Sequence, residues 1–130
     1  MRYQFNYYCE SNRLKQQIEV DIQMVYIIIV LTYPPHLADE VGKTYIEAMG
    51  KVPDDRAIAK PTIRAAVEAT MEGMKVTAIY DVKAGKIREA LDLTSNRMLI
   101  FAKIKGLRYS LNTAYNATEA MGLLGMTAPE

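Results

Sequence analysis

The residues best suited to bind a small molecule are three tyrosines and one arginine, Tyr33, Tyr80, Tyr109 and Arg64. The tyrosines fall on three predicted strands and Arg64 on a fourth, while Arg108 lies next to Tyr109. A phenol hydroxyl both donates and accepts a hydrogen bond, so tyrosines that project into a cavity can orient a carbonyl or phenolic ligand. The alternative is that these side chains only pack across neighbouring strands with their hydroxyl groups in water.

His36 is the only histidine of the chain and the candidate catalytic residue. It lies at the junction between the first predicted strand and the first predicted helix. A neutral imidazole in that position could act as a general base. The alternative is an ordinary exposed residue of a turn, and the sequence leaves both interpretations open.

No motif indicates a metal ion or a cofactor, and none is expected. One cysteine, Cys9, and one histidine lie too far apart in sequence to suggest a zinc site. Asp54 and Asp55 lack the further oxygen ligands that calcium requires, so we expect them in a solvated loop. The chain has no glycine-rich phosphate loop, GxSxG or CxxC motif.

The charge balance argues against nucleic acid and membrane partners. Sixteen Lys and Arg residues against 15 Asp and Glu residues leave a net charge of +1, with no excess of positive charge for a polyanion. The longest apolar run, residues 24–33, is too short to span a bilayer. Glu19 and Asp21 precede it in place of the basic region of a signal peptide. The single cysteine fits a reducing compartment, so a cytoplasmic location is expected.

The elements that must position these residues begin with the segment MVYIIIVLTY, residues 24–33. Residues 25–31 are apolar at every position and rich in β-branched residues, and Pro34 and Pro35 follow soon after, which indicates a strand and not a helix. A strand without polar positions is expected to be central in its sheet and buried on both faces. The eight methionines and nine tyrosines of the chain suit a pliable core or a ligand pocket, and also ordinary core packing.

Periodicity predicts two helices and three further strands after this strand. Helical spacing of apolar residues predicts helices over 36–49 and 87–104. Alternation predicts strands over 62–70, 75–83 and 107–115, with a hairpin turn at 71–74. The segment 62–70 could instead be helical, since it is rich in alanine and glutamate. Asn116 and Glu119 have capping-box spacing, which predicts a short helix through Leu124.

The resulting order is strand, helix, strand, strand, helix, strand, an α+β arrangement in which the first and third strands are central. Right-handed crossovers place both helices on one face of a four-stranded antiparallel sheet. The other face also carries apolar residues, which a second copy of the chain would bury. We therefore expect a homodimer through the sheet face.

In element order and strand character, residues 24–115 resemble the ferredoxin-like dimeric α/β-barrel superfamily. The resemblance implies a βαββαβ sandwich that pairs into a barrel. The superfamily includes cofactor-free monooxygenases, muconolactone-type isomerases, and haem-degrading and dye-decolorising enzymes, so the fold alone does not select an activity. The leading hypothesis is a homodimer that binds a small hydrophobic molecule. The alternatives are a cofactor-independent monooxygenase or isomerase, and a structural or regulatory assembly module.

Residues 1–23 differ in composition from the domain expected over residues 24–130, since they are more polar and contain no Gly or Pro. Tyr3, Phe5 and Tyr7 alternate, which suits an additional strand. Alternatively, translation begins naturally at Met24, because Glu19 and Val20 can be encoded by the core of a ribosome-binding sequence. Residues 1–23 would then be a leader without a role of its own.

Overall fold

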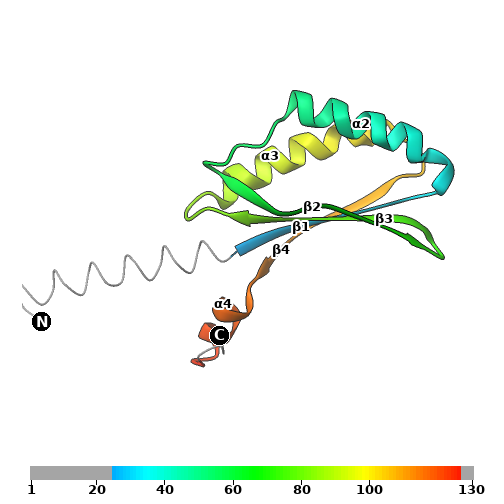
Figure 1. Ribbon diagram of the computed structural model, residues 1–130. Coiled ribbons are helices and arrows are strands. Elements are labelled where there is room, and N and C mark those ends of the chain that lie inside the picture. Colours follow the sequence, from blue (N-terminus) through cyan, green and yellow to red (C-terminus); the bar gives the residue numbers. More distant parts are fainter. Residues whose placement is uncertain (1–24, 127–130) are drawn as a thin grey trace, which may run out of the picture.

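The computed structural model describes residues 25–126, which form a four-stranded antiparallel sheet with two long helices on one face (Figure 1). The strands have the order β2-β3-β1-β4. The elements are β1 (Val25–Tyr33), the 3₁₀ helix η1 (Pro35–Leu37), α2 (Ala38–Lys51), β2 (Ala59–Thr70), β3 (Gly73–Val82), α3 (Ile87–Ile100), the 3₁₀ helix η2 (Phe101–Lys103), β4 (Arg108–Tyr115) and α4 (Ala117–Leu123).

The expected elements are present, with shifted ends. The first helix begins as the turn η1 and continues to Lys51, and the second changes from α3 to η2 after Ile100. Segment 62–70 is part of a strand, so the helical alternative is wrong. The Asn116 side chain accepts a hydrogen bond from the Glu119 N–H at 2.8 Å, which confirms the predicted cap of α4.

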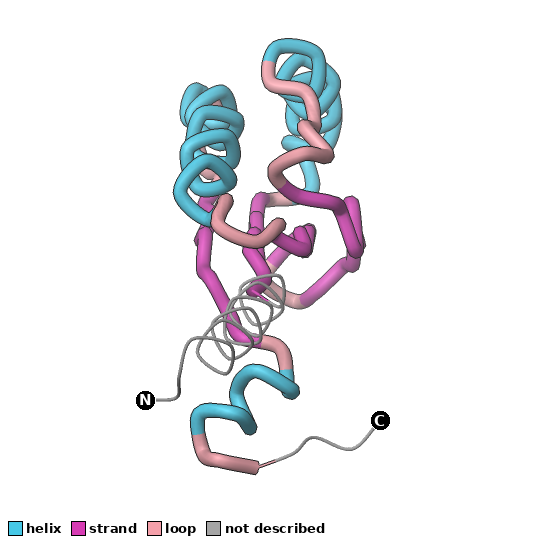
Figure 2. The backbone as a smooth tube through the Cα atoms, turned by 90° about the vertical axis from the view of Figure 1, so that its left-hand side faces the viewer, coloured by secondary structure: helices cyan, strands magenta, loops and turns pink. Residues whose placement is uncertain are grey.

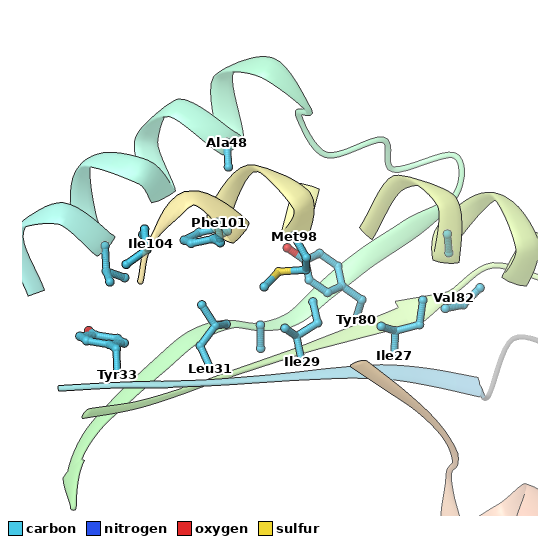
Figure 3. Close-up of a cluster of buried hydrophobic side chains, with 13 residues drawn as sticks. Ile27, Ile29, Leu31, Tyr33, Ala48, Tyr80, Val82, Met98, Phe101 and Ile104 are labelled. Atoms are coloured by element: carbon cyan, nitrogen blue, oxygen red, sulfur yellow. The ribbon is translucent and has the colours of Figure 1, made fainter. Parts of the chain in front are cut away.

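The core lies between the sheet and the helices α2 and α3. On β1 the residues Ile27, Ile29, Leu31 and Tyr33 are buried and point toward the helices (Figure 3). Their neighbours on β3 in the strand register include Ala78 and Tyr80, which are buried on the same face. We call this side of the sheet the helix face. The alternation of β1 and β3 therefore produces one apolar layer, which the helices cover.

The opposite side of the sheet, which we call the open face, corrects one expectation. It carries Tyr26, Ile28 and Val30 of β1 and Ile79 of β3, which are only half-buried. Of the described elements, only the short helix α4 lies on this side, whereas α2 and α3 lie side by side on the other (Figure 2). The expectation that β1 is buried on both faces is therefore wrong for the single chain.

The hairpin between β2 and β3 requires the glycine that the sequence places there. Gly73 has φ +126°, and a Cβ atom at this position would lie 2.7 Å from the carbonyl oxygen of Tyr33. The Thr70 hydroxyl donates to the Gly73 carbonyl at 2.7 Å and closes the turn. A side chain at residue 73 would therefore force the end of β1 away from the hairpin.

Strand β2 lies at an edge of the sheet and pairs irregularly with β3. Its register shifts between Pro61 and Ile63 and again between Ile63 and Ala66. Proline removes one donor from the ladder, and bulges of this kind are concentrated on edge strands. Most of β2 is exposed, and the register shifts change which of its residues face the helices.

The strand order, with β1 and β3 central and both long helices on one face, is consistent with a ferredoxin-like arrangement. The expectations for residues 1–23, and for Met24 as the start of the strand, lie outside the described residues. No helix among residues 25–126 is long and apolar enough to cross a membrane.

Replacement of a β1 residue on the helix face should destabilise the fold. Ile29 is 3% exposed, so Ile29→Ala removes buried methyl groups and is expected to lower the unfolding free energy by about 2–5 kcal/mol. Ile46→Ala on α2 is the matched control, because Ile46 is 73% exposed and should change stability by less than about 0.5 kcal/mol. Urea denaturation of both variants measures the difference. Equal stabilities would contradict the assignment of the core.

Candidate functional site

A cavity of about 360 Å³ lies on the helix face, between α2 and the strands β1, β2 and β3. Most of its lining is apolar and includes Leu31, Val41, Met49, Met98 and Phe101. The exposed β2 residues Ala65 and Val67 form its outer side, so solvent reaches it there. Its volume and its mainly apolar lining are typical of pockets that bind small molecules.

Small residues leave room for this cavity. Ala38, Gly42, Ala65 and Ala78 line the cavity from α2, β2 and β3. At Gly42, an added Cβ atom would meet nothing within 4 Å. A large side chain at any of these positions would occupy the cavity, whereas the small ones hold it open between well-packed neighbours.

The polar end of the cavity is built around Arg97, which is only 5% exposed. Its Nη1 donates to the Tyr80 hydroxyl at 2.9 Å, and its Nε donates to the Val52 carbonyl at 3.0 Å. Its Nη2 donates to the Asp54 carboxylate at 3.1 Å. The guanidinium carbon also lies 5.9 Å from the centre of the Tyr80 ring, within the range of a cation–π contact.

Asp54 connects Arg97 to a second arginine. One carboxylate oxygen of Asp54 faces Arg97, and the other lies 2.8 Å from Nη1 of Arg64 on β2. The Asp54 side chain is 15% exposed and that of Arg64 is 45% exposed. The cluster of Arg97, Asp54 and Arg64 therefore runs from the buried end of the cavity to its surface and carries two positive charges against one negative charge.

Tyr80 and Arg64, two of the hydrogen-bond donors at this end, stay protonated at neutral pH. Burial raises the pKa of Tyr80 above its ordinary value, although the charge of Arg97 opposes that change. The hydrogen bond from Arg64 to Asp54 raises the pKa of Arg64. Tyr80 therefore presents a neutral phenol and Arg64 a guanidinium cation.

Three of the four predicted ligand-binding residues line this one cavity, namely Tyr33, Arg64 and Tyr80. Tyr109 does not. It pairs with Leu31 and so shares the helix face, but it lies on β4, at the opposite edge of the sheet from β2, and is 44% exposed. Arg108 pairs with Thr32 and lies on the open face.

His36 is exposed on η1 and does not line the cavity. It borders a separate, shallow depression with Asp39, Glu47 and Lys103. Glu47 there accepts a hydrogen bond from Lys103 at 2.7 Å, which lowers the pKa of Glu47. The position of His36 thus gives no support to its candidate role as a base in the cavity.

Sequence reasoning missed Arg97, Asp54 and Tyr45. Arg97 lies on the same face of α3 as the buried residues Ala90, Thr94 and Met98. A charged residue on the buried face of a helix indicates an ion pair in the interior, because charged side chains are rarely buried without a partner. The expectation of a solvated loop is correct for Asp55, which is exposed, and wrong for Asp54, because Arg97 and Arg64 both contact it. Among residues 25–126, no three His, Cys, Asp or Glu side chains are grouped to hold a metal ion.

No protein-family model and no curated protein matches the sequence. One solved structure, described as a REP-associated tyrosine transposase bound to a REP hairpin, has a TM-score of 0.41 and 12% sequence identity. The match covers 78% of this chain and 62% of the transposase chain. Similarity at this level gives no information about the activity of this chain.

Removal of the Asp54 charge should destabilise the protein. Asp54→Asn leaves the buried Arg97 guanidinium without its anion, which is expected to cost about 3 kcal/mol of unfolding free energy. Asp92→Asn on the exposed side of α3 is the matched control and should stay within about 0.5 kcal/mol of the parent. Chemical denaturation compares the two. An Asp54→Asn variant as stable as the control would show that the cluster does not support the fold.

Proposed function

We propose that the chain binds a small, mainly apolar molecule in the cavity between α2 and the sheet. The observation that carries this proposal is an apolar space of about 360 Å³ that ends in a small number of fixed polar groups. Ligand sites combine these two features, because the apolar lining supplies affinity and the polar groups orient the ligand. Tyr33, Tyr45, Tyr80, Met49 and Met98 all line the space, as expected for a pliable pocket.

The polar lining favours binding over acid–base catalysis. It consists of phenols and guanidinium groups, which donate hydrogen bonds at neutral pH. Burial raises the pKa of Tyr80 and so keeps its hydroxyl protonated at neutral pH, whereas a general base must be in its deprotonated form. A cofactor-independent monooxygenase or isomerase would require a base at the cavity, and His36 lies elsewhere.

The proposal is tested by filling the cavity from α2. Gly42→Leu places an apolar side chain in the space and should weaken the binding of naphthalene, a neutral apolar probe, by about tenfold or more. Gly50→Leu is the matched control, because Gly50 belongs to the same helix, has open space around it and does not line the cavity. Equilibrium dialysis measures the affinity.

Two results would contradict cavity binding. One is an absence of naphthalene binding to the parent protein. The other is equal affinity of Gly42→Leu and Gly50→Leu, which would place the probe at another surface. Thermal unfolding of both variants monitors folding, since replacement of glycine within a helix is favourable by itself.

We further propose that the open face of the sheet binds a second copy of the chain, as in a dimeric α/β barrel. Its central residues include the apolar Ile28, Val30, Ile63 and Ile79, of which Ile63 is 41% exposed, next to the polar Thr77 and Asn112. Lys60, Lys75 and Arg108 flank this centre together with Glu68 and Asp81. A surface with both signs of charge around an apolar centre can pair with its own copy across a twofold axis.

Helix α4 supports the same interface. It lies on the side of the sheet that α2 and α3 leave open (Figures 1 and 2). Leu123, Leu124 and Met126 at its end are exposed. A second copy on the open face would lie next to these side chains and bury them together with the sheet residues.

A charge in the centre of the open face should separate the two copies. The parent protein is expected to sediment at twice the chain mass of 14.7 kDa at low micromolar concentration, and Ile28→Lys at the chain mass. Leu99→Lys on α3 is the matched control, since Leu99 is exposed on the helix side and should leave the dimer intact. A parent protein at 14.7 kDa, or an Ile28→Lys variant at twice that mass, would refute this interface.

A further inference from the structure

We propose that the molecule bound in the cavity is a small monocarboxylic acid, with its carboxylate at Arg64 and Tyr80 and its apolar body against Leu31, Met49 and Phe101. This inference rests on the proposed function, because it requires that the cavity binds a ligand. It adds the chemical class of that ligand. The support comes from the hydrogen-bond inventory and the charge at the polar end of the cavity.

The acceptors at the polar end are already occupied by protein donors. Both Asp54 oxygens face arginines, and the Val52 carbonyl accepts from Arg97. The Tyr80 hydroxyl oxygen accepts from Arg97 as well, so its own proton remains available to a ligand. Polar groups on a ligand that enters this end therefore meet donors, and an acceptor-rich group fits there best.

Arg64 adds further donors to the same end. Among residues 25–126, its charged partner is Asp54, which contacts Nη1. A guanidinium group carries five N–H donors in a planar fork, so this pair leaves others free, apart from a hydrogen bond with Tyr45. A planar carboxylate matches the spacing of such a fork and can accept two parallel hydrogen bonds.

The charge at the polar end points to a monoanion. Arg97 and Arg64 share the single carboxylate of Asp54, which leaves one positive charge uncompensated within the cluster. One carboxylate balances it. A phosphate monoester carries about −1.5 to −2 charges at neutral pH and would exceed it.

The location of these groups orients the ligand. Arg64 is 45% exposed on the edge strand β2, whereas Tyr80 is 7% exposed and lies deeper, beside Met98 (Figure 3). The carboxylate between them would keep one side near water, and the apolar body would extend along the buried lining. This placement desolvates the apolar part of the ligand more completely than its charge.

The test compares phenylacetate with its neutral isostere phenylacetamide by titration calorimetry at neutral pH. Phenylacetate should bind the parent protein about tenfold more tightly, because a charged hydrogen bond replaces a neutral one. Arg64→Gln should reduce this preference to near unity, and Tyr80→Phe should reduce it in part. Arg88→Gln removes the same charge from an exposed position on α3 and should keep the full preference.

Naphthalene serves as the internal reference. Arg88→Gln should bind it as the parent does, and thermal unfolding of Arg64→Gln checks that the fold of that variant persists. If naphthalene binds while phenylacetate binds no better than phenylacetamide, the acid is refuted and cavity binding stands. A preference that survives in Arg64→Gln also refutes the assignment. If Gly42→Leu leaves naphthalene binding unchanged, the proposed function itself is wrong.

Discussion

The buried guanidinium of Arg97 is the interaction on which the rest of this structure depends. It extends from α3 and is hydrogen-bonded to the Val52 carbonyl and Asp54 after α2 and to Tyr80 on β3. Asp54 then reaches Arg64 on β2. A charge this deeply buried is stable only when its donors are satisfied. That requirement fixes the loop between α2 and β2, and with it the end of α2, relative to the sheet.

The cavity follows from this arrangement together with the small residues of its walls. The Arg97 cluster connects the loop after α2 to Tyr80 on β3. Gly42 and Ala78 then fail to fill the space that remains. Water reaches this apolar lining from the side of β2, and contact with water does not stabilise it. A bound apolar molecule would remove the lining from water, which is the physical reason for our proposal that the space is a site.

The sequence predicted the fold much better than the site. The apolar run of β1, the period of two in β3 and the cap at Asn116 report local preferences, and each element appeared close to its expected bounds. The irregular register of β2 could not be predicted, because bulges depend on how an edge strand pairs with its neighbour. Three of the four tyrosine and arginine candidates line the cavity. Alternation in β3 predicted that Tyr80 shares a face with Val76 and Ala78, whereas Arg64 and its neighbour Ala65 on β2 both line the cavity, which alternation does not predict. The role of Asp54 depended on Arg97, 43 residues away, and sequence spacing carries no information about such a contact.

Residues 25–31 of β1 are all apolar, although the helices cover only one face of this strand. Alternation with polar residues is the ordinary pattern for a strand with one wet face. Here Ile28 and Val30 are as apolar as the buried Ile27 and Ile29, yet they are half-buried in the single chain. Water contact with these side chains gives no stabilisation, whereas burial on a second copy does. On this proposal one strand serves two purposes: Ile29, Leu31 and Tyr33 line the cavity, and Ile28 and Val30 contribute to the open face that would bind a second copy.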